Sequence, residues 1–142
     1  MNLDEIKGMV DRAWEQKSLD EIIKASVEAL QGITNKGKEA LQSALKVKSI
    51  EDLANNEYVK KAQAIVNGTI QDVKKTVDKA WENKSLQEIA NSSLVTLQGV
   101  TQKGADLLKE AMNIKTIKDL AQNKYVVNAQ NMVNEAKKKL GL

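Results

Sequence analysis

The sequence repeats itself with a period of 67 residues, and this internal duplication restricts the possible folds more than any other feature. DRAWEQKSLDEI at 11–22 aligns with DKAWENKSLQEI at 78–89, and KSIEDLANNEYVKKAQAIVN at 48–67 aligns with KTIKDLAQNKYVVNAQNMVN at 115–134. Residues 1–67 and 68–134 share 32 identities over 67 columns without a gap. We therefore expect two tandem copies of one structural module, covering residues 1–67 and 68–142.

The composition of the chain favours an all-α fold. Proline, the strongest helix breaker, is absent, while Ala, Leu, Lys, Glu and Gln are abundant. Phenylalanine is also absent, so the core must consist mainly of aliphatic side chains. Trp14 and Trp81 each lie on an apolar helical stripe beside an alanine, and we predict that they anchor the core rather than stack on a ligand.

Helix start and stop signals recur at the same places in both copies. Ser18 with Glu21, and Ser85 with Glu88, have the spacing of a capping box at a helix start. The segments SIED at 49–52 and TIKD at 116–119 predict another short helix in each copy. Before the first capping box, apolar residues at helical spacing predict a helix that ends near Lys17; they are Leu3, Ile6, Val10, Ala13 and Trp14.

The junction between the copies contains no proline and no loop-like cluster from about residue 57 to residue 83. An apolar seam crosses it at helical spacing, formed by Val59, Ala62, Val66, Ile70, Val73, Val77, Ala80 and Trp81. The sequence therefore predicts one continuous linker helix, roughly 40 Å long at 1.5 Å per residue. Gly68 lies in the middle of this helix, where it is expected to permit a bend.

The absence of cysteine and histidine excludes several kinds of chemistry. Disulfides, thiolate nucleophiles, Ser–His–Asp triads and the common zinc sites all need these residues. The carboxylate pairs fall in predicted first helical turns, where acids favour the helix dipole; they are Asp4/Glu5, Asp20/Glu21 and Glu51/Asp52. We expect a protein that is not an enzyme and has no catalytic residues, cofactor or metal.

The N-terminal segment MNLDEIKGMV lacks the basic start and the apolar run of a signal peptide. No stretch approaches the roughly 18 consecutive apolar residues of a membrane span. The sequence therefore predicts a cytoplasmic protein that does not enter a membrane.

Each copy contains a glycine-rich segment with the pattern of a tight turn between two helices: LQGITNKGKEAL at 30–41 and LQGVTQKGADLL at 97–108. Gly32 is expected to end the preceding helix with a positive φ. Thr34 is expected to cap the following helix, because threonine is a good N-cap residue. Both features recur in copy two, at Gly99 and Thr101.

The longer run ASVEALQGITNKGKEALQSALKVKSIEDLA at 25–54 resembles the helix-hairpin-helix family. That family's pattern is a short helix, a hairpin usually written Gly-aliphatic-Gly, a second helix and a closing Thr/Ser-Ile/Val-x-Asp-Leu element. SIEDLA and TIKDLA are similar to the closing element of such domains in recombinases and in the carboxy-terminal domain of the alpha chain of RNA polymerase. The resemblance covers about 30 residues of each copy. It implies two tandem helix-hairpin-helix-like (SAM/HhH-type) modules.

In DNA-binding members of that family, free backbone amides at the hairpin and at the second helix's N-terminus contact a phosphate. The resemblance implies such contacts from Gly32, Thr34, Asn35, Lys36 and Lys38 in copy one, and from Gly99, Thr101, Gln102 and Lys103 in copy two. Both copies depart from the family pattern, because a threonine replaces the second hairpin glycine. A Cβ there hinders close approach, and a capping hydroxyl takes an amide hydrogen bond that a phosphate would accept. The residues therefore favour hairpins that need no ligand.

The charge distribution gives little support for a strong polyanion binder. The net charge is +3, with −1 on residues 1–67 and +4 on residues 68–142. Three charged positions of copy one are apolar in copy two: Glu28, Lys38 and Lys60 align with Val95, Ala105 and Val127. The two copies are therefore expected to share a backbone fold but to differ in surface chemistry. We therefore predict a non-catalytic macromolecule-binding adaptor or scaffold with a protein partner. The alternative is sequence-independent duplex DNA binding through the two hairpins and their lysines.

Overall fold

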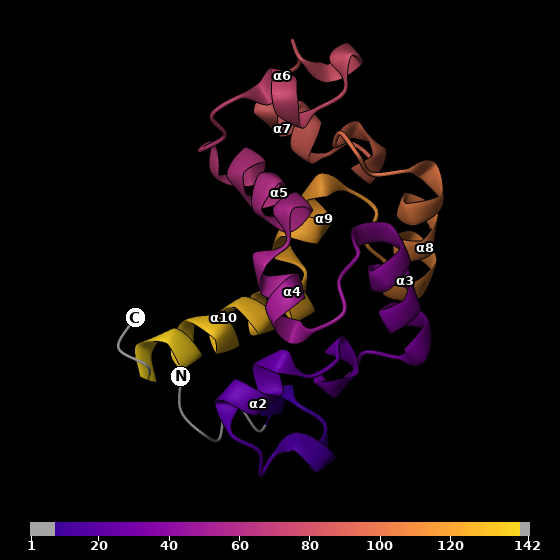
Figure 1. Ribbon diagram of the computed structural model, residues 1–142. Coiled ribbons are helices and arrows are strands. Elements are labelled where there is room, and N and C mark those ends of the chain that lie inside the picture. Colours follow the sequence, from indigo (N-terminus) through magenta and orange to yellow (C-terminus); the bar gives the residue numbers. More distant parts are fainter. Residues whose placement is uncertain (1–7, 140–142) are drawn as a thin grey trace.

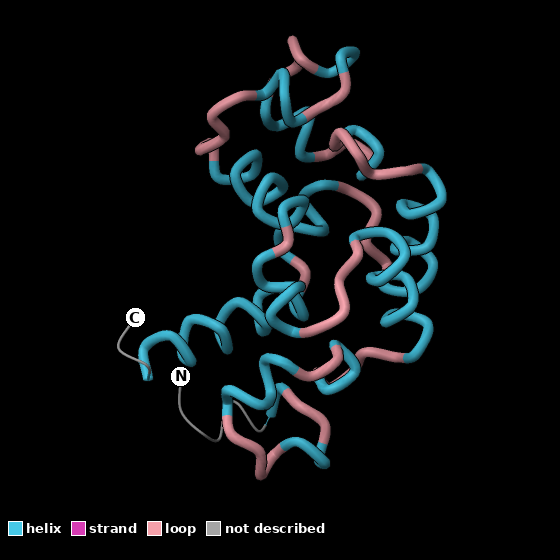
Figure 2. The backbone as a smooth tube through the Cα atoms, viewed as in Figure 1, coloured by secondary structure: helices cyan, strands magenta, loops and turns pink. Residues whose placement is uncertain are grey.

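A computed structural model describes residues 8–139 of the chain. The part that it describes consists of helices joined by turns, with isolated bridges but no strand, so the predicted all-α class is confirmed. Figures 1 and 2 show this arrangement. The α-helices are α2 (Leu19–Lys24), α3 (Asn35–Leu45), α4 (Ile50–Asn55), α5 (Glu57–Asn67), α6 (Val73–Thr76), α7 (Leu86–Ala90), α8 (Gln102–Met112), α9 (Ile117–Gln122) and α10 (Lys124–Lys139). Single 3-10 turns form η1 (Arg12–Trp14), η2 (Val27–Ala29), η3 (Lys79–Trp81) and η4 (Leu94–Thr96).

The predicted helix starts are confirmed by their cap hydrogen bonds. The Ser18 hydroxyl accepts from the Glu21 amide at 3.2 Å at the start of α2, and Ser85 accepts from Glu88 at 3.1 Å at the start of α7. Reciprocal capping boxes begin α4 and α9, where Asp52 and Asp119 stand at the third helical position. These bonds satisfy amides that an uncapped helix would leave without a partner.

The predicted continuous helix from about 57 to 83 is wrong. Helix α5 ends at Asn67, because Gly68 adopts a left-handed conformation with φ 74° and closes the helix. Figure 2 shows the loop that follows, and α6 then begins at an Asp72 cap and ends at Thr76. Val77 is extended and forms an isolated bridge with Leu97, which prevents α6 from continuing into η3.

The predicted first helix is also interrupted. Val10 forms an isolated bridge with Leu30, and the chain makes only a 3-10 turn at Arg12–Trp14. The short helix predicted before Gly32 is likewise a single 3-10 turn, η2. The predicted positions Leu3 and Ile6 lie outside the described residues. In each copy, a bridged residue therefore fixes the start of the module against the hairpin segment.

The two sequence repeats exchange their last helices. Helix α5, which ends the first repeat, packs against α7 and α9 of the second. Helix α10, which ends the second repeat, packs against α4 and α2 of the first, and Figure 1 shows it returning toward α2. One spatial unit is therefore α5 to α9, continuous in sequence, and the other combines α2, α3 and α4 with α10. One continuous cluster of buried apolar residues extends through both units.

Helices α3 and α8 lie side by side and antiparallel, and they join the two units (Figure 1). A Cβ on Gly104 would lie 3.1 Å from the Cα of Ala44, and a Cβ on Gly37 would lie 3.5 Å from the Cγ of Met112. Glycine at these positions therefore lets the two helices approach closely. Helices α5 and α10 meet where Gln63 and Gln130 exchange side-chain hydrogen bonds of 2.9 Å in both directions. These two residues are equivalent in the repeats and mark an approximate two-fold axis.

Candidate functional site

The two glycine-rich turns at residues 30–37 and 97–104, called the first and second hairpin here, have nearly the same geometry. Gly32 and Gly99 have φ values of 97° and 96°, and the positive φ predicted for Gly32 is confirmed. The hydroxyl of Thr34 accepts a 3.0 Å hydrogen bond from the Gly37 amide at the start of α3. The hydroxyl of Thr101 accepts the corresponding bond at the start of α8, also at 3.0 Å. Each threonine is a helix cap, as its sequence position predicts.

Each hairpin glycine is covered by a tyrosine from the other repeat. The hydroxyl of Tyr125 donates a 3.1 Å hydrogen bond to the carbonyl oxygen of Gly32. A Cβ on Gly32 would lie 2.7 Å from this hydroxyl, and a Cβ on Gly99 would lie 2.5 Å from the hydroxyl of Tyr58. The approach side of each glycine is therefore occupied by a protein side chain.

The remaining residues implied by the family resemblance lie at the surface in the first turns of α3 and α8. Lys36 and Lys103 are exposed. The side-chain amide of Asn35 donates a 3.4 Å hydrogen bond to the carboxylate of Glu39. At the equivalent place in copy two, the side-chain amide of Gln102 donates a 2.9 Å hydrogen bond to the carboxylate of Asp106. Because α3 and α8 are antiparallel, the structure places their N-termini at opposite ends of the helix pair. The two hairpins and their lysines are thus not brought together.

The charged residue Lys38 has a local partner. Its ammonium group lies 2.7 Å from the carboxylate of Glu28, and the two side chains are 35% and 43% exposed. In copy two, Val95 stands in the place of Glu28 and is partly buried, and Ala105 stands in the place of Lys38 and is buried. This difference between the copies is therefore an ion pair replaced by an apolar pair.

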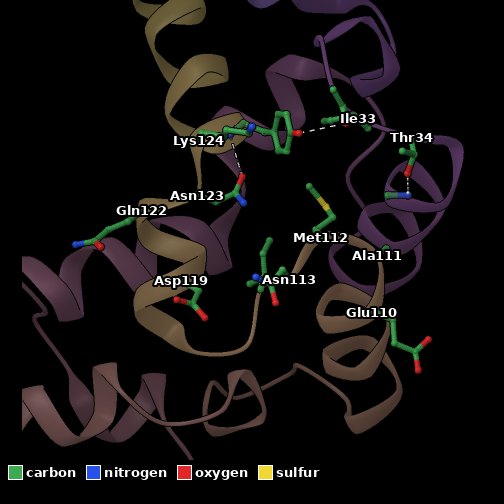
Figure 3. Close-up of a pocket in the computed structure, with 14 residues that line it drawn as sticks. Ile33, Thr34, Glu110, Ala111, Met112, Asn113, Asp119, Gln122, Asn123 and Lys124 are labelled. Carbon is green, nitrogen blue, oxygen red and sulfur yellow. Dashed lines mark hydrogen bonds between the residues drawn. The ribbon is translucent and has the colours of Figure 1, made fainter.

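A cleft of about 650 Å³ opens beside the first hairpin (Figure 3). It lies between that hairpin, the end of α8, helix α9 and the start of α10. Its lining residues are Gly32, Ile33, Thr34, Gly37, Glu110, Ala111, Met112, Asn113, Ile114, Asp119, Gln122, Asn123, Lys124 and Tyr125. The cleft therefore combines the hairpin of one repeat with three segments of the other.

The floor of the cleft is apolar and partly open. Ile33 and Met112 are both partly exposed, and Figure 3 shows the Met112 side chain directed into the cleft. Their repeat equivalents are Val100 and Leu45, which are buried at 7% and 3% exposure. The two hairpins therefore differ, because the corresponding apolar side chains at the second hairpin are closed off from solvent.

The polar rim of the cleft is held by contacts that serve the fold. The Asp119 carboxylate accepts from the amides of Lys115 and Thr116 at 3.0 and 3.1 Å. The Asn123 side chain caps α10 by accepting from the amide of Tyr125 at 3.0 Å, and the Lys124 ammonium lies 5.1 Å from the centre of the Tyr125 ring. The side chains of Asp119, Asn123 and Lys124 therefore each have a partner within the fold.

Chemistry-bearing clusters are scarce in the described part of the chain. Among residues 8–139, no group of three or more metal-ligating side chains could hold an ion. No helix in that range has both the length and the apolar character that a membrane crossing requires. Trp14 and Trp81, predicted as core anchors, are partly exposed and pack against the margin of the core.

Comparison of the chain with protein-family models, with curated proteins and with solved structures gave no match. The resemblance to helix-hairpin-helix domains therefore stays a prediction. The features that sequence reasoning missed are the tyrosine covers and the cleft. The sequence does contain a sign of the tyrosine covers, because Tyr58 and Tyr125 are equivalent residues of the two repeats, as are Gly32 and Gly99.

Proposed function

We propose that the protein is a non-catalytic adaptor, built from two helix-hairpin-helix-like modules, that binds a protein partner in the cleft beside the first hairpin. The observation that carries this proposal is the difference between the two hairpins. Ile33 and Met112 form a partly open apolar floor at one hairpin, while Val100 and Leu45 are buried at the other. A protein side chain can remove such a floor from water, and burial of apolar area is the main favourable term in protein association.

The hairpins themselves give phosphate little access. Threonine hydroxyls already accept from the amides of Gly37 and Gly104, and tyrosines cover Gly32 and Gly99. The two lysine-bearing turns also lie at opposite ends of the α3–α8 pair. A protein ligand for the cleft is consequently favoured over duplex DNA bound across both hairpins.

Site-specific photo-cross-linking tests this proposal. A benzoylphenylalanine placed at Glu110, an exposed residue of the cleft, is expected to yield a discrete protein adduct in cells. The matched control is Ser43, its exposed repeat equivalent, which is expected to yield none. Adducts at both positions alike, or at neither, would contradict the proposal.

A second substitution shows whether the adduct depends on the cleft floor. Ile33→Glu places a charge on the floor and is expected to abolish the adduct at position 110. Gln31→Glu adds the same charge at an exposed position outside the cleft and is expected to leave the adduct intact. Circular dichroism of both variants establishes that neither has unfolded.

A further inference from the structure

The contacts between the two repeats are made by residues that the repeats share. Tyr125 covers Gly32 while Tyr58 covers Gly99, so one contact occurs twice with the roles exchanged. Gln63 and Gln130 bond to each other across the approximate axis. An interface is self-complementary, as in a two-fold dimer, when each contact between two residues occurs a second time with the two sides exchanged.

The α3–α8 contact follows this rule in part, because the two glycines face residues that are not equivalent. Gly37 of α3 faces the end of α8, and Gly104 of α8 faces Ala44 near the end of α3. Ala44 is itself repeated as Ala111. Two copies of α3 therefore carry the same glycine and alanine, with Leu45 in the place of Met112 opposite Gly37.

The exchanged helices also match closely. The buried face of α5 carries Val59, Ala62 and Ile65, and the equivalent positions of α10 are Val126, Ala129 and Met132, all buried. Two of these three pairs are identical, and the third exchanges two apolar side chains of similar volume, a change that cores tolerate. Helix α5 ends at Asn67, whereas α10 continues to Lys139, so α5 of a second copy would reproduce the part of α10 at residues 124–134 on the surface of α2 and α4.

We propose that the first repeat recognises a second copy of itself, and that the full chain is such a two-fold dimer fused through the loop at residues 68–72. The kind of partner that fits the inter-repeat surface is another chain carrying the same repeat. The cleft borders the inter-repeat surface, because Gly32, Gly37 and Tyr125 line it, but the proposal requires no ligand in the cleft.

The experiment uses the complete chain with a protease site inserted between Gly68 and Thr69, which are exposed in the loop after α5. Two preparations with different tags on the first repeat are cleaved, mixed and left to exchange. We expect each tag to co-purify the other, because first repeats pair with first repeats. If every first repeat retains only a second repeat, or if the released first repeats stay monomeric, the proposal is overturned.

A cysteine near the approximate two-fold axis tests how two first repeats are arranged relative to each other. The chain has no natural cysteine, so Gln63→Cys in the cleaved, mixed protein is expected to form a disulfide between two first repeats. Asp20→Cys is the control, because α2 and its repeat equivalent α7 lie at opposite ends of the molecule (Figure 1). Equal cross-linking at positions 20 and 63 would show association without the two-fold arrangement and would overturn the proposal.

Discussion

The hydroxyl of Tyr125 donates a hydrogen bond to the carbonyl oxygen of Gly32, which lies 93 residues earlier in the chain. The bond joins the start of the last helix to the turn before α3, and so connects the two repeats. Gly32 permits this contact because it lacks a Cβ and has φ 97°. The turn that resembles a phosphate-binding hairpin therefore binds the Tyr125 side chain of the same protein.

Substitution of the hairpin glycine is expected to destabilise the fold. Gly32→Ala forces a Cβ against the Tyr125 hydroxyl and strains a positive-φ backbone, a strain that costs about 1–3 kcal/mol. Gly68→Ala has the same backbone problem with open space around the Cβ, so it measures the strain alone. Gly8→Ala, exposed and without a near neighbour, is the control. Chemical denaturation gives the three values, and equal losses at Gly32 and Gly68 would argue against a role for the tyrosine.

Removal of a hairpin cap is expected to lower stability without changing the fold. Thr34→Ala and Thr101→Ala each delete the hydroxyl that accepts the N3 amide, at a cost of about 1 kcal/mol in the free energy of unfolding. Thr34→Ser and Thr101→Ser keep that hydroxyl and are expected to retain most of the stability. Thermal denaturation compares the four variants; serine variants as unstable as the alanine variants would refute the capping role.

The glutamine pair on the axis is expected to behave as a coupled unit. Gln63→Leu removes the side-chain partner of the Gln130 amide, which keeps a 3.4 Å hydrogen bond to the carbonyl oxygen of Ala54, so the expected cost is about 1 kcal/mol. Gln63→Leu with Gln130→Leu removes both polar groups, so its loss is expected to be smaller than the sum of the single losses. A double-mutant cycle by urea denaturation measures this coupling, and strict additivity would show that the two residues act independently.

Duplex DNA binding is expected to be absent at physiological salt. Threonine hydroxyls accept from the amides of Gly37 and Gly104, tyrosines cover Gly32 and Gly99, and the two lysine-bearing turns lie at opposite ends of the α3–α8 pair. Fluorescence anisotropy with a labelled duplex at low and physiological salt provides the measurement. Lys36→Glu with Lys103→Glu is compared with Lys17→Glu plus Lys84→Glu, exposed repeat equivalents outside the hairpins. Salt-sensitive binding lost only in the hairpin pair would favour the DNA alternative.

Local features of the fold could be predicted from the sequence because local chemistry determines them. Ser18, Thr34 and Ser49 begin helices through hydrogen bonds to amides only three residues away. Gly32 adopts the positive φ that its place after a short helical segment indicates. Such features depend on a few neighbouring residues, and both repeats show them.

The long linker helix was predicted wrongly because an apolar seam reports burial and not continuity. Val77 is fully buried, but it lies in an extended bridge rather than in a helix. Val66, Ile70 and Val73 also pack against the core, although Gly68 has already ended α5. The spacing of apolar residues shows which side of a segment is buried. It does not show which other helices bury that side, and the exchange of α5 and α10 depends on this.

The cleft could not be predicted because it arises from a small difference between equivalent positions. Met112 and Ile33 remain partly exposed, while Leu45 and Val100 are buried by the packing at the other hairpin. No spacing or motif distinguishes these pairs of apolar residues. The positions of the hairpins could be predicted, but the difference in their surroundings could not.

The return of α10 to the N-terminal helices has a consequence for the order in which the chain is completed during synthesis. The unit from α5 to α9 is contiguous, so its helices emerge from the ribosome one after another and meet the partners they need. Helices α2 and α4 emerge earlier, but the surface that packs against α10 is covered only when α10 follows. Domains usually fold from the N-terminus onward as they are made. Helices α2 and α4 are thus synthesised before α5 to α9, but the surface that they turn toward α10 is sheltered from water later.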